Sequence, residues 1–306
     1  MLCFGCELNE FDAMKRFWMD DDEAISCLRL HGILPSKVTC PHCHSDCELR
    51  KERNIWQCLT KTKVGESKYR ACGFTLNDRE GTVLDKIDVS PWKLLLFFNH
   101  WLSRCWSYDL MASNLMLTND TILTLSRLCF AVSQFWFDTQ IPAKPFGGSG
   151  VVLEIDICHF DDLTEIEGWR QTVLGAYERH TDRLFFVLVE DVENSLIPVI
   201  QRYIQKGSIL YTTDREDFLP LKEYGYEHRV VSASSTDQDI NIRGIKSKWH
   251  GLRSWKRRIR KARREEKYHP RYLSRYLFVN YYLSPDRLHH FLRCVAEFAH
   301  ESVPER

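Results

Sequence analysis

The segment "VVLEIDICHF" (residues 151–160) decides the fold of this protein, because it places an acidic residue inside an apolar run. Its Val, Leu and Ile residues predict a β-strand, and Asp156 lies among them. A carboxylate is costly to bury unless it coordinates something. The segment therefore predicts a strand whose carboxylate serves a binding purpose.

The segments that follow predict the rest of a sheet. "WRQTVLGAYER" and "RLFFVLVED" have the pattern of hairpin partners, "SLIPVIQRYIQKG" that of a helix ending at Gly207, and "SILYTTD" that of a strand ending at Asp214. This order, followed by a long helical tail, predicts an α/β fold. Asp156 and Asp214 on adjacent strands could hold two Mg²⁺ ions roughly 3.5–4 Å apart. The alternative, for either aspartate taken alone, is that it only forms a turn or caps a helix.

Residues 87–140 predict a helical region before a Pro/Gly linker, "IPAKPFGGSG" (residues 141–150). Ser90 and Pro91 predict one helix start, and Thr118 predicts another after the break "LTNDT". Two helices joined by a tight polar turn indicate a helix-turn-helix that binds DNA. A plain helical hairpin in the core fits the pattern equally well.

Cysteines dominate the N-terminal part, where eight of the twelve lie before residue 73. After a helical lead-in over residues 1–37, the Cys40-x-x-Cys43 spacing predicts one half of a zinc site in a ribbon over residues 38–86. Cys58 and Cys72 are the expected second half, with "LTKTKVGESKYRA" inserted between them. The substitute ligands are Cys47, His42 and His44. Cys3 and Cys6 are expected to be free thiols, or else half of another site.

A basic stretch spans residues 253–275, with eleven Lys and Arg against two Glu. Aromatic residues interleave with these cations, as on surfaces that bind nucleic acid. The alternative is a solvated helix face. The residues predicted to contact DNA are Lys248, Trp249, Arg253, Lys256, Arg257, Arg258, Arg260 and Lys261.

The remaining composition bounds the environment. No apolar run reaches the roughly 18 residues that a membrane span needs, and the first residues lack the layout of a signal peptide. We therefore expect a soluble protein in a reducing compartment. "KRRIRKARR" (residues 256–264) also fits a nuclear-import patch.

Several segments, in order, resemble transposases of the Merlin superfamily, the eukaryotic relatives of bacterial insertion-sequence transposases. They are "CPHC", the Gly81-Thr82 pair, "VVLEIDICHF", "GWRQTVLGAYERHTDRLFFVLVED", "YTTDREDFLPLKEYGYEHRVV" and "GIKSKWHGLR". The resemblance covers nearly the whole chain and implies a ribonuclease H-like DDE core over residues 150–300. It also implies an N-terminal zinc ribbon, double-stranded DNA as partner, a homo-oligomer, a nuclear location, and Mg²⁺ or Mn²⁺ in an active enzyme.

The resemblance also implies roles for single residues. Asp156 and Asp214 match the first two catalytic acids, and the third lies in a motif of the form Ile-Glu-Ser-x-Trp. This chain has Lys246 at the glutamate position, between Ile245 and Ser247. A protonated amine repels cations and offers no lone pair, so we expect a DNA-binding protein that has lost cleavage.

Two alternatives to this prediction stay open. One is an active transposase that cuts and joins DNA at terminal inverted repeats, with Asp237, Asp239 or His250 replacing the missing ligand. The other is an adaptor that binds protein and has lost DNA contact.

Overall fold

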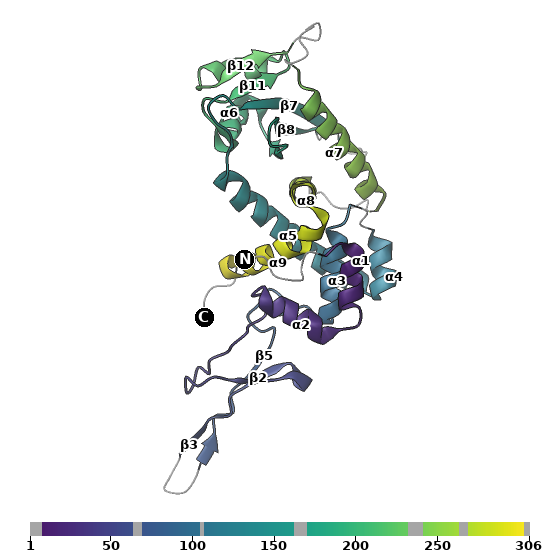
Figure 1. The fold of residues 1–306 in the computed structure, drawn as a ribbon, viewed down its shortest axis with the longest axis vertical. Coiled ribbons are helices and arrows are strands. Elements are labelled where there is room, and N and C mark those ends of the chain that lie inside the picture. The colour runs from purple at the N-terminus through teal and green to yellow at the C-terminus, as the bar shows by residue number, and fades with distance from the viewer. Residues whose placement is uncertain are drawn as a thin grey trace. The chain divides into compact units, whose positions relative to one another are not determined.

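The computed structural model describes residues 8–63, 69–104, 107–161, 170–231, 241–262 and 269–302. The chain divides into two compact units, which are drawn in Figure 1. The N-terminal unit comprises Met1–Val132 and Ser284–Arg306, and the core unit comprises Ser133–Leu283. No described helix is both long and apolar enough to cross a membrane.

The core unit is built on a five-stranded sheet with the order β12-β11-β7-β8-β9. β7, β8 and β9 are antiparallel, whereas β11 and β12 run parallel to β7. The predicted order of three strands, a helix and a strand is therefore present, with β12 added at one edge. The strands are β7 (Val152–Asp161), β8 (Arg170–Glu178), β9 (Leu184–Val189), β11 (Ile209–Thr212) and β12 (Glu227–Val230).

Alternation along β7 gives the sheet two different faces. Leu153, Ile155 and Ile157 are buried on one face, which shares Phe185 of β9 and packs toward helix α6. Asp156 lies on the opposite face, and we call this the Asp156 face. Helix α7 covers it, as Figure 1 shows beside β7 and β8. The other elements of the unit are α6 (Val192–Tyr203), η2 (Glu216–Lys222), α7 (Arg243–Ala262) and α8 (His269–Tyr281).

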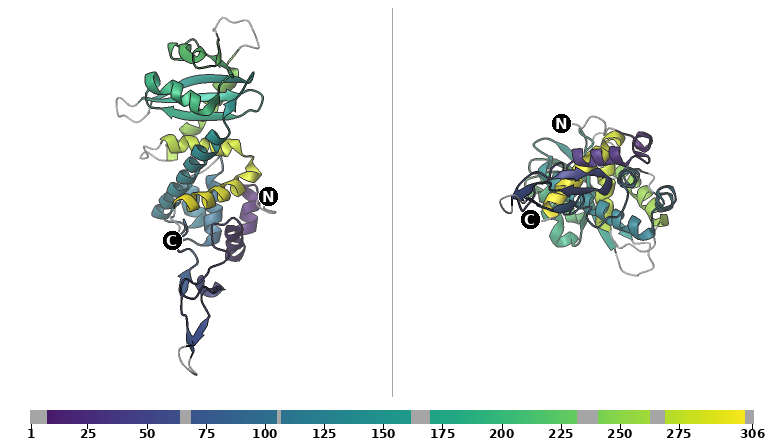
Figure 2. Two further views of the ribbon diagram at one scale, coloured as in Figure 1. Left: turned by 90° about the vertical axis from the view of Figure 1, so that its left-hand side faces the viewer. Right: turned by 90° about the horizontal axis from the view of Figure 1, so that it is seen from below.

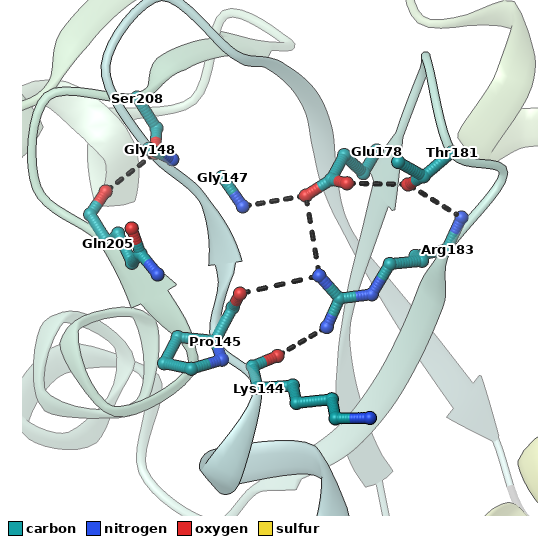
Figure 3. Close-up of polar contacts among 9 residues, drawn as sticks. All are labelled: Lys144, Pro145, Gly147, Gly148, Glu178, Thr181, Arg183, Gln205 and Ser208. Atoms are coloured by element: carbon teal, nitrogen blue, oxygen red, sulfur yellow. Dashed lines mark hydrogen bonds and ion pairs between the residues drawn. The ribbon is translucent and has the colours of Figure 1, made fainter.

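The predicted linker after residue 140 is fastened to the core by backbone and side-chain bonds. Helix α5 (Asn119–Ala143) runs into it, and β6 (Phe146–Gly147) pairs in parallel with β10 (Ile204–Gln205). Figure 3 shows the buried Glu178 accepting a 2.7 Å hydrogen bond from the Gly147 N–H. A Cβ at Gly147 would overlap the Ser208 hydroxyl, and its φ is +80°, so glycine is required there.

Arg183 completes this connection from the β8–β9 hairpin. Its guanidinium donates to the carbonyl oxygens of Lys144 and Pro145 (Figure 3). It also lies over the Phe146 ring, 4.1 Å from the centroid. These hydrogen bonds pair backbone groups of the linker with side chains of β8 and of the β8–β9 hairpin. The linker is therefore attached to the core unit.

Helices form most of the N-terminal unit. Aromatic side chains of α3 and α9 meet in its core, where Phe98 and Trp101 lie 5.4 and 5.7 Å from Phe291 between ring centroids. Helix α9 thus packs outside the core unit, although the sequence assigned residues up to 300 to the core domain. The helices are α1 (Glu10–Phe17), α2 (Asp21–Leu30), α3 (Pro91–Trp101), α4 (Tyr108–Leu115) and α9 (Arg287–Ser302), with η3 (Ser284–Asp286) before α9.

The cysteine-rich segment (residues 38–86) forms small antiparallel sheets in the same unit. One has the order β1-β2-β5, and the other is the β3–β4 hairpin, which extends away from α2 in Figures 1 and 2. The buried Asp78 joins this segment to α2, since it accepts hydrogen bonds from the Trp56 indole (2.8 Å) and from Arg29 (2.5 Å). Its elements are β1 (Glu48–Arg50), η1 (Lys51–Arg53), β2 (Ile55–Gln57), β3 (Lys61–Lys63), β4 (Tyr69–Ala71) and β5 (Thr75–Asn77).

Candidate active site and metal centre

Asp156 lies in the middle of the sheet, on the face covered by α7. It stands opposite Gly175 of β8, which in turn stands opposite Phe186 of β9. A Cβ at Gly175 would lie 2.6 Å from the Trp249 ring and 2.7 Å from Phe186. Glycine at this position therefore lets Trp249 pack flat against the sheet beside Asp156 and holds α7 close to the strand.

Glu154 fixes the start of α7 and was not singled out from the sequence. It is two residues before Asp156 on the same face and is only 2 % exposed. One carboxylate oxygen accepts a 2.7 Å hydrogen bond from Arg179, and the other accepts a 2.9 Å bond from the Ile245 N–H. The unpaired N–H groups at a helix start favour a negative charge, which explains this contact.

Lys246 follows directly and is exposed at the first turn of α7. Burial raises the pKa of Asp156 above its ordinary value. Hydrogen bonding by the Ile157 N–H and by Trp249 lowers it in part, and the positive charge of Lys246 acts in the same lowering direction to a smaller extent. The charge of Arg215 also lowers the pKa of Asp156, to a smaller extent. The structure thus places two cations within electrostatic range of this carboxyl group.

Asp214 is exposed and follows β11 before η2. Because β11 is parallel to β7, with Tyr211 opposite Glu154, the continued register brings Asp214 level with residues 156–157. The two aspartates therefore lie at the same level on two adjacent strands. Among the described residues, neither aspartate belongs to a group of three or more His, Cys, Asp or Glu side chains close enough to share an ion.

Arg215 and His159 lie close to this level of the two strands, and neither was predicted as a site residue. The Arg215 guanidinium donates a 3.1 Å bond to Asp217 and lies 3.5 Å from the His159 ring. His159 in turn contacts the Thr172 hydroxyl at 3.0 Å. Only the parallel pairing of β11 with β7 brings residue 215 beside residue 159, and no local sequence pattern predicts that pairing.

Replacing Asp156 by Asn should raise the melting temperature at pH 7. The folded-state pKa lies above the unfolded value of about 3.9, so ionising Asp156 opposes folding as pH rises through the folded pKa. Each kcal/mol regained corresponds to roughly 2–4 °C. Thermal unfolding of both proteins should show the gain at pH 7 and none below the unfolded pKa. The exposed Asp138→Asn variant is the control, and an equal gain in it would contradict the assignment.

All the residues predicted to contact DNA lie in α7, but the side chain of Trp249 is buried. Trp249 is 2 % exposed and stacks on Phe186 with 4.4 Å between ring centroids, so its indole belongs to the core and cannot stack on DNA bases. Trp255 and Tyr276 are buried in the same way and pack together. Trp255 of α7 therefore contacts Tyr272 and Tyr276 of α8, and Trp249 packs on the sheet.

The cations of α7 divide into two groups. Lys248 lies 3.5 Å from Asp182 and above the Tyr177 ring, and Arg253 donates to the Cys158 sulfur at 2.9 Å. The backbone of the remaining predicted cations lies in α7, but their side chains lie outside the described part of the structure. These are Lys256, Arg257, Arg258, Arg260 and Lys261.

A separate metal-binding geometry is present in the cysteine-rich segment. The sulfur atoms of Cys40, Cys43, Cys58 and Cys72 all lie within 4.8 Å of one another. Cys40 and Cys72 are 3.5 Å apart, and Cys43 and Cys58 are 3.4 Å apart. Tetrahedral zinc with Zn–S bonds of about 2.3 Å requires sulfur separations near 3.8 Å. The four thiols therefore fit a tetrahedral metal site in which all four ligands come from the protein.

Backbone turns bring these thiols together. Cys58 donates its N–H to Phe74, and Cys72 donates its N–H to Thr60, so the two ligands lie at the base of the β3–β4 hairpin. The expected insertion between the second pair of cysteines is this hairpin. Hydrogen bonds to Ser45 lower the pKa of Cys43 to about 6, which favours the thiolate form that binds metals.

The substitute ligands lie near the cluster without joining it. Cys47 is buried, and burial raises the pKa of its thiol. The His42 ring lies 4.0 Å from the Cys72 sulfur and packs against Phe74. Cys3, Cys6, Asp237 and Asp239 lie outside the described residues.

The comparison with protein families agrees with the geometry of the core unit. Residues 160–279 match the ISXO2-like transposase domain, a span that includes Asp214 and Lys246 and begins just after Asp156. A comparison with curated proteins found no match. The family match supports a transposase-derived protein with a domain of the insertion-sequence DDE type, joined to an N-terminal cluster of four cysteines that could bind a metal ion such as zinc.

Proposed function

We propose that this protein binds double-stranded DNA through a ribonuclease H-like transposase core that has lost strand cleavage. The transposase match supports a protein that evolved to handle DNA. An antiparallel three-stranded unit, extended by two parallel strands after a helix, supports the ribonuclease H-like fold. The observation that carries the loss of cleavage is Lys246, an exposed cation in the first turn of α7, at the position where the family resemblance implies the third acid.

Lys246 opposes the binding of divalent cations electrostatically. Two-metal phosphodiester chemistry uses divalent ions to activate the nucleophile and stabilise the leaving oxygen, and carboxylates hold those ions. Asp156 and Asp214 would supply two such ligands for Mg²⁺ or Mn²⁺. A lysine in the third position removes a negative charge and adds a positive one, and both changes weaken cation binding at Asp156.

Glu154 does not supply the missing third ligand. Glu154 lies on the same face as Asp156, but its two oxygens are occupied by Arg179 and the backbone of α7. His250 is exposed one turn after Lys246, and imidazole is a poor ligand for Mg²⁺. Glu154 therefore has a structural role in this account, and the alternative of an active transposase depends on a ligand supplied from elsewhere.

Other parts of the proposal follow from the family resemblance. We propose a Merlin-type transposase origin, a structural zinc ion held by the four cysteines, a nuclear location and a homo-oligomeric assembly. The helices α4 and α5, joined by a short turn at Met116 with φ +49°, support the predicted helix-turn-helix. In a closed four-cysteine site, zinc stabilises the fold and takes no part in chemistry.

The purified protein should bind duplex DNA with a strong salt dependence. If about six phosphates are contacted, affinity should fall by roughly 10³-fold between about 50 and 200 mM salt. Fluorescence anisotropy with a labelled duplex measures this, and a supercoiled plasmid with added Mg²⁺ or Mn²⁺ measures nicking. Metal-dependent nicking that the Asp156→Asn variant lacks would overturn the proposed loss of cleavage.

A further inference from the structure

The β3–β4 hairpin is a surface that the transposase match does not include. Its strands pair antiparallel, with Lys61 opposite Ala71 and Thr62 opposite Arg70. Because side chains alternate along a strand, Lys61 and Arg70 belong to opposite faces of the hairpin. Both are exposed, so each face of this two-stranded ribbon carries a cation at its surface.

The hairpin carries a strong excess of positive charge. Residues 60–71 contain Lys61, Lys63, Lys68 and Arg70 against the single acid Glu66. Tyr69 shares the face of Lys61 and is 66 % exposed, so its ring is available for a contact beside the cations. An exposed tyrosine among cations is the combination that suits a polyanion carrying apolar surfaces, such as nucleic acid.

The four-cysteine cluster lies at the base of the hairpin. Cys72 donates its N–H to Thr60 at 2.8 Å, directly below the first pair of β3–β4, and Cys58 is paired with Phe74. An isolated two-stranded hairpin is marginally stable in water. A metal ion that links Cys58 and Cys72 to Cys40 and Cys43 would fix the base of the hairpin against the rest of the cysteine-rich segment.

The other predicted DNA-binding element of this unit has the wrong charge. Residues 107–128, which contain α4 and the start of α5, include Arg127 as their one cation, against Asp109 and Asp120. Non-specific DNA affinity comes mainly from contacts of Lys and Arg with phosphates. Electrostatics therefore favour the hairpin over the helix-turn-helix candidate as the surface that attracts DNA.

We propose that the β3–β4 hairpin contacts the phosphates of double-stranded DNA, using Lys61 and Arg70 on its two faces. This inference rests on the proposed DNA-binding function and names the surface responsible in the N-terminal unit. Two paired strands lie about 4.8 Å apart, and a major groove about 12 Å wide admits a two-stranded ribbon. Phosphates on both groove walls would then meet a cation on each face.

The test compares two charge-reversal variants of the full chain. Lys61→Glu with Arg70→Glu changes the hairpin, and Lys15→Glu with Arg293→Glu makes the same change in charge at exposed helical positions of the same unit. Duplex binding is measured by anisotropy over a salt series, and zinc content checks that the hairpin base is intact. The hairpin variant should bind at least about tenfold more weakly, with a salt slope reduced by about two.

The outcomes separate this inference from the proposed function. If the natural protein binds duplex DNA and the hairpin variant binds equally well with its zinc retained, the inference is overturned while the proposed function stands. The same follows if the control variant loses as much affinity, or if only binding to single strands changes. If the natural protein binds no duplex at low salt, the proposed function fails and the hairpin inference fails with it.

Discussion

Replacing Cys58 by Ala should abolish tight zinc binding and unfold the cysteine-rich segment. Apparent zinc binding energies of about 10–16 kcal/mol, shared by four thiolates, give on the order of 3 kcal/mol for each ligand. Loss of Cys58 should therefore weaken zinc binding by roughly a hundredfold. Competition with a colorimetric chelator measures the affinity, and elemental analysis measures the zinc content per chain.

Cys47→Ala is the matched control, because Cys47 is also a buried cysteine of the same segment and packs in the same apolar cluster. It loses the same atoms as Cys58→Ala but no metal ligand. Zinc affinity should remain unchanged in this variant. If both variants lose zinc equally, or neither does, the ligand set of Cys40, Cys43, Cys58 and Cys72 is wrong.

Replacing Glu154 by Gln should destabilise the core unit by about 3 kcal/mol, the lower end of the range for breaking a buried ion pair. The change takes the carboxylate charge away from the Arg179 guanidinium, which still donates to the Asn241 carbonyl oxygen, and it weakens the contact with the Ile245 N–H at the start of α7. Circular dichroism during urea unfolding measures the loss. The exposed Glu190→Gln variant should stay within about 0.5 kcal/mol of the natural protein.

A second substitution distinguishes the ion pair from simple loss of packing. Arg179→Met in the Glu154→Gln background removes the positive charge that has lost its carboxylate, so part of the stability should return. If the double variant is as unstable as the sum of the single changes, Glu154 does not act through Arg179. If Glu154→Gln has no effect on stability, the proposed seating of α7 is incorrect.

Local sequence patterns predicted the elements of the core unit well. The apolar run of β7, the hairpin of β8 and β9, and the Asp214 strand end are all where the alternation placed them. Pro91 begins α3, and the Thr118 hydroxyl accepts the Thr121 N–H at the start of α5. These features depend on residues that are neighbours in sequence, which explains why they could be predicted.

Features that depend on long-range pairing could not be read in the same way. β12 is a short edge strand, and its partner β11 is set by the crossover through η2. Helix α9 is amphipathic, and its pattern does not reveal that its apolar side packs on Phe98 and Trp101 of the N-terminal unit. The sequence predicted a helical tail within residues 150–300, and α9, the last helix of that tail, packs with the N-terminal unit.

The candidate sites show the same division. The Cys40-x-x-Cys43 spacing is a local signal, and the cluster it predicted is present. Glu154 was missed because its partners, Arg179 and Ile245, are distant in sequence and meet it only in the folded sheet. Trp249 was misassigned to the DNA surface because composition alone does not show that Gly175 leaves room for a buried indole.

The central claim is that Lys246 prevents divalent cations from being used at Asp156 and Asp214. The most direct measurement is Mg²⁺- or Mn²⁺-dependent strand cleavage by Lys246→Glu, compared with Lys246→Ala and with Lys246→Glu carrying Asp156→Asn. We expect cleavage to appear in Lys246→Glu, to be weak or absent in Lys246→Ala, and to disappear when Asp156 is also replaced. Cleavage by the natural protein that equals that of Lys246→Glu would contradict the account.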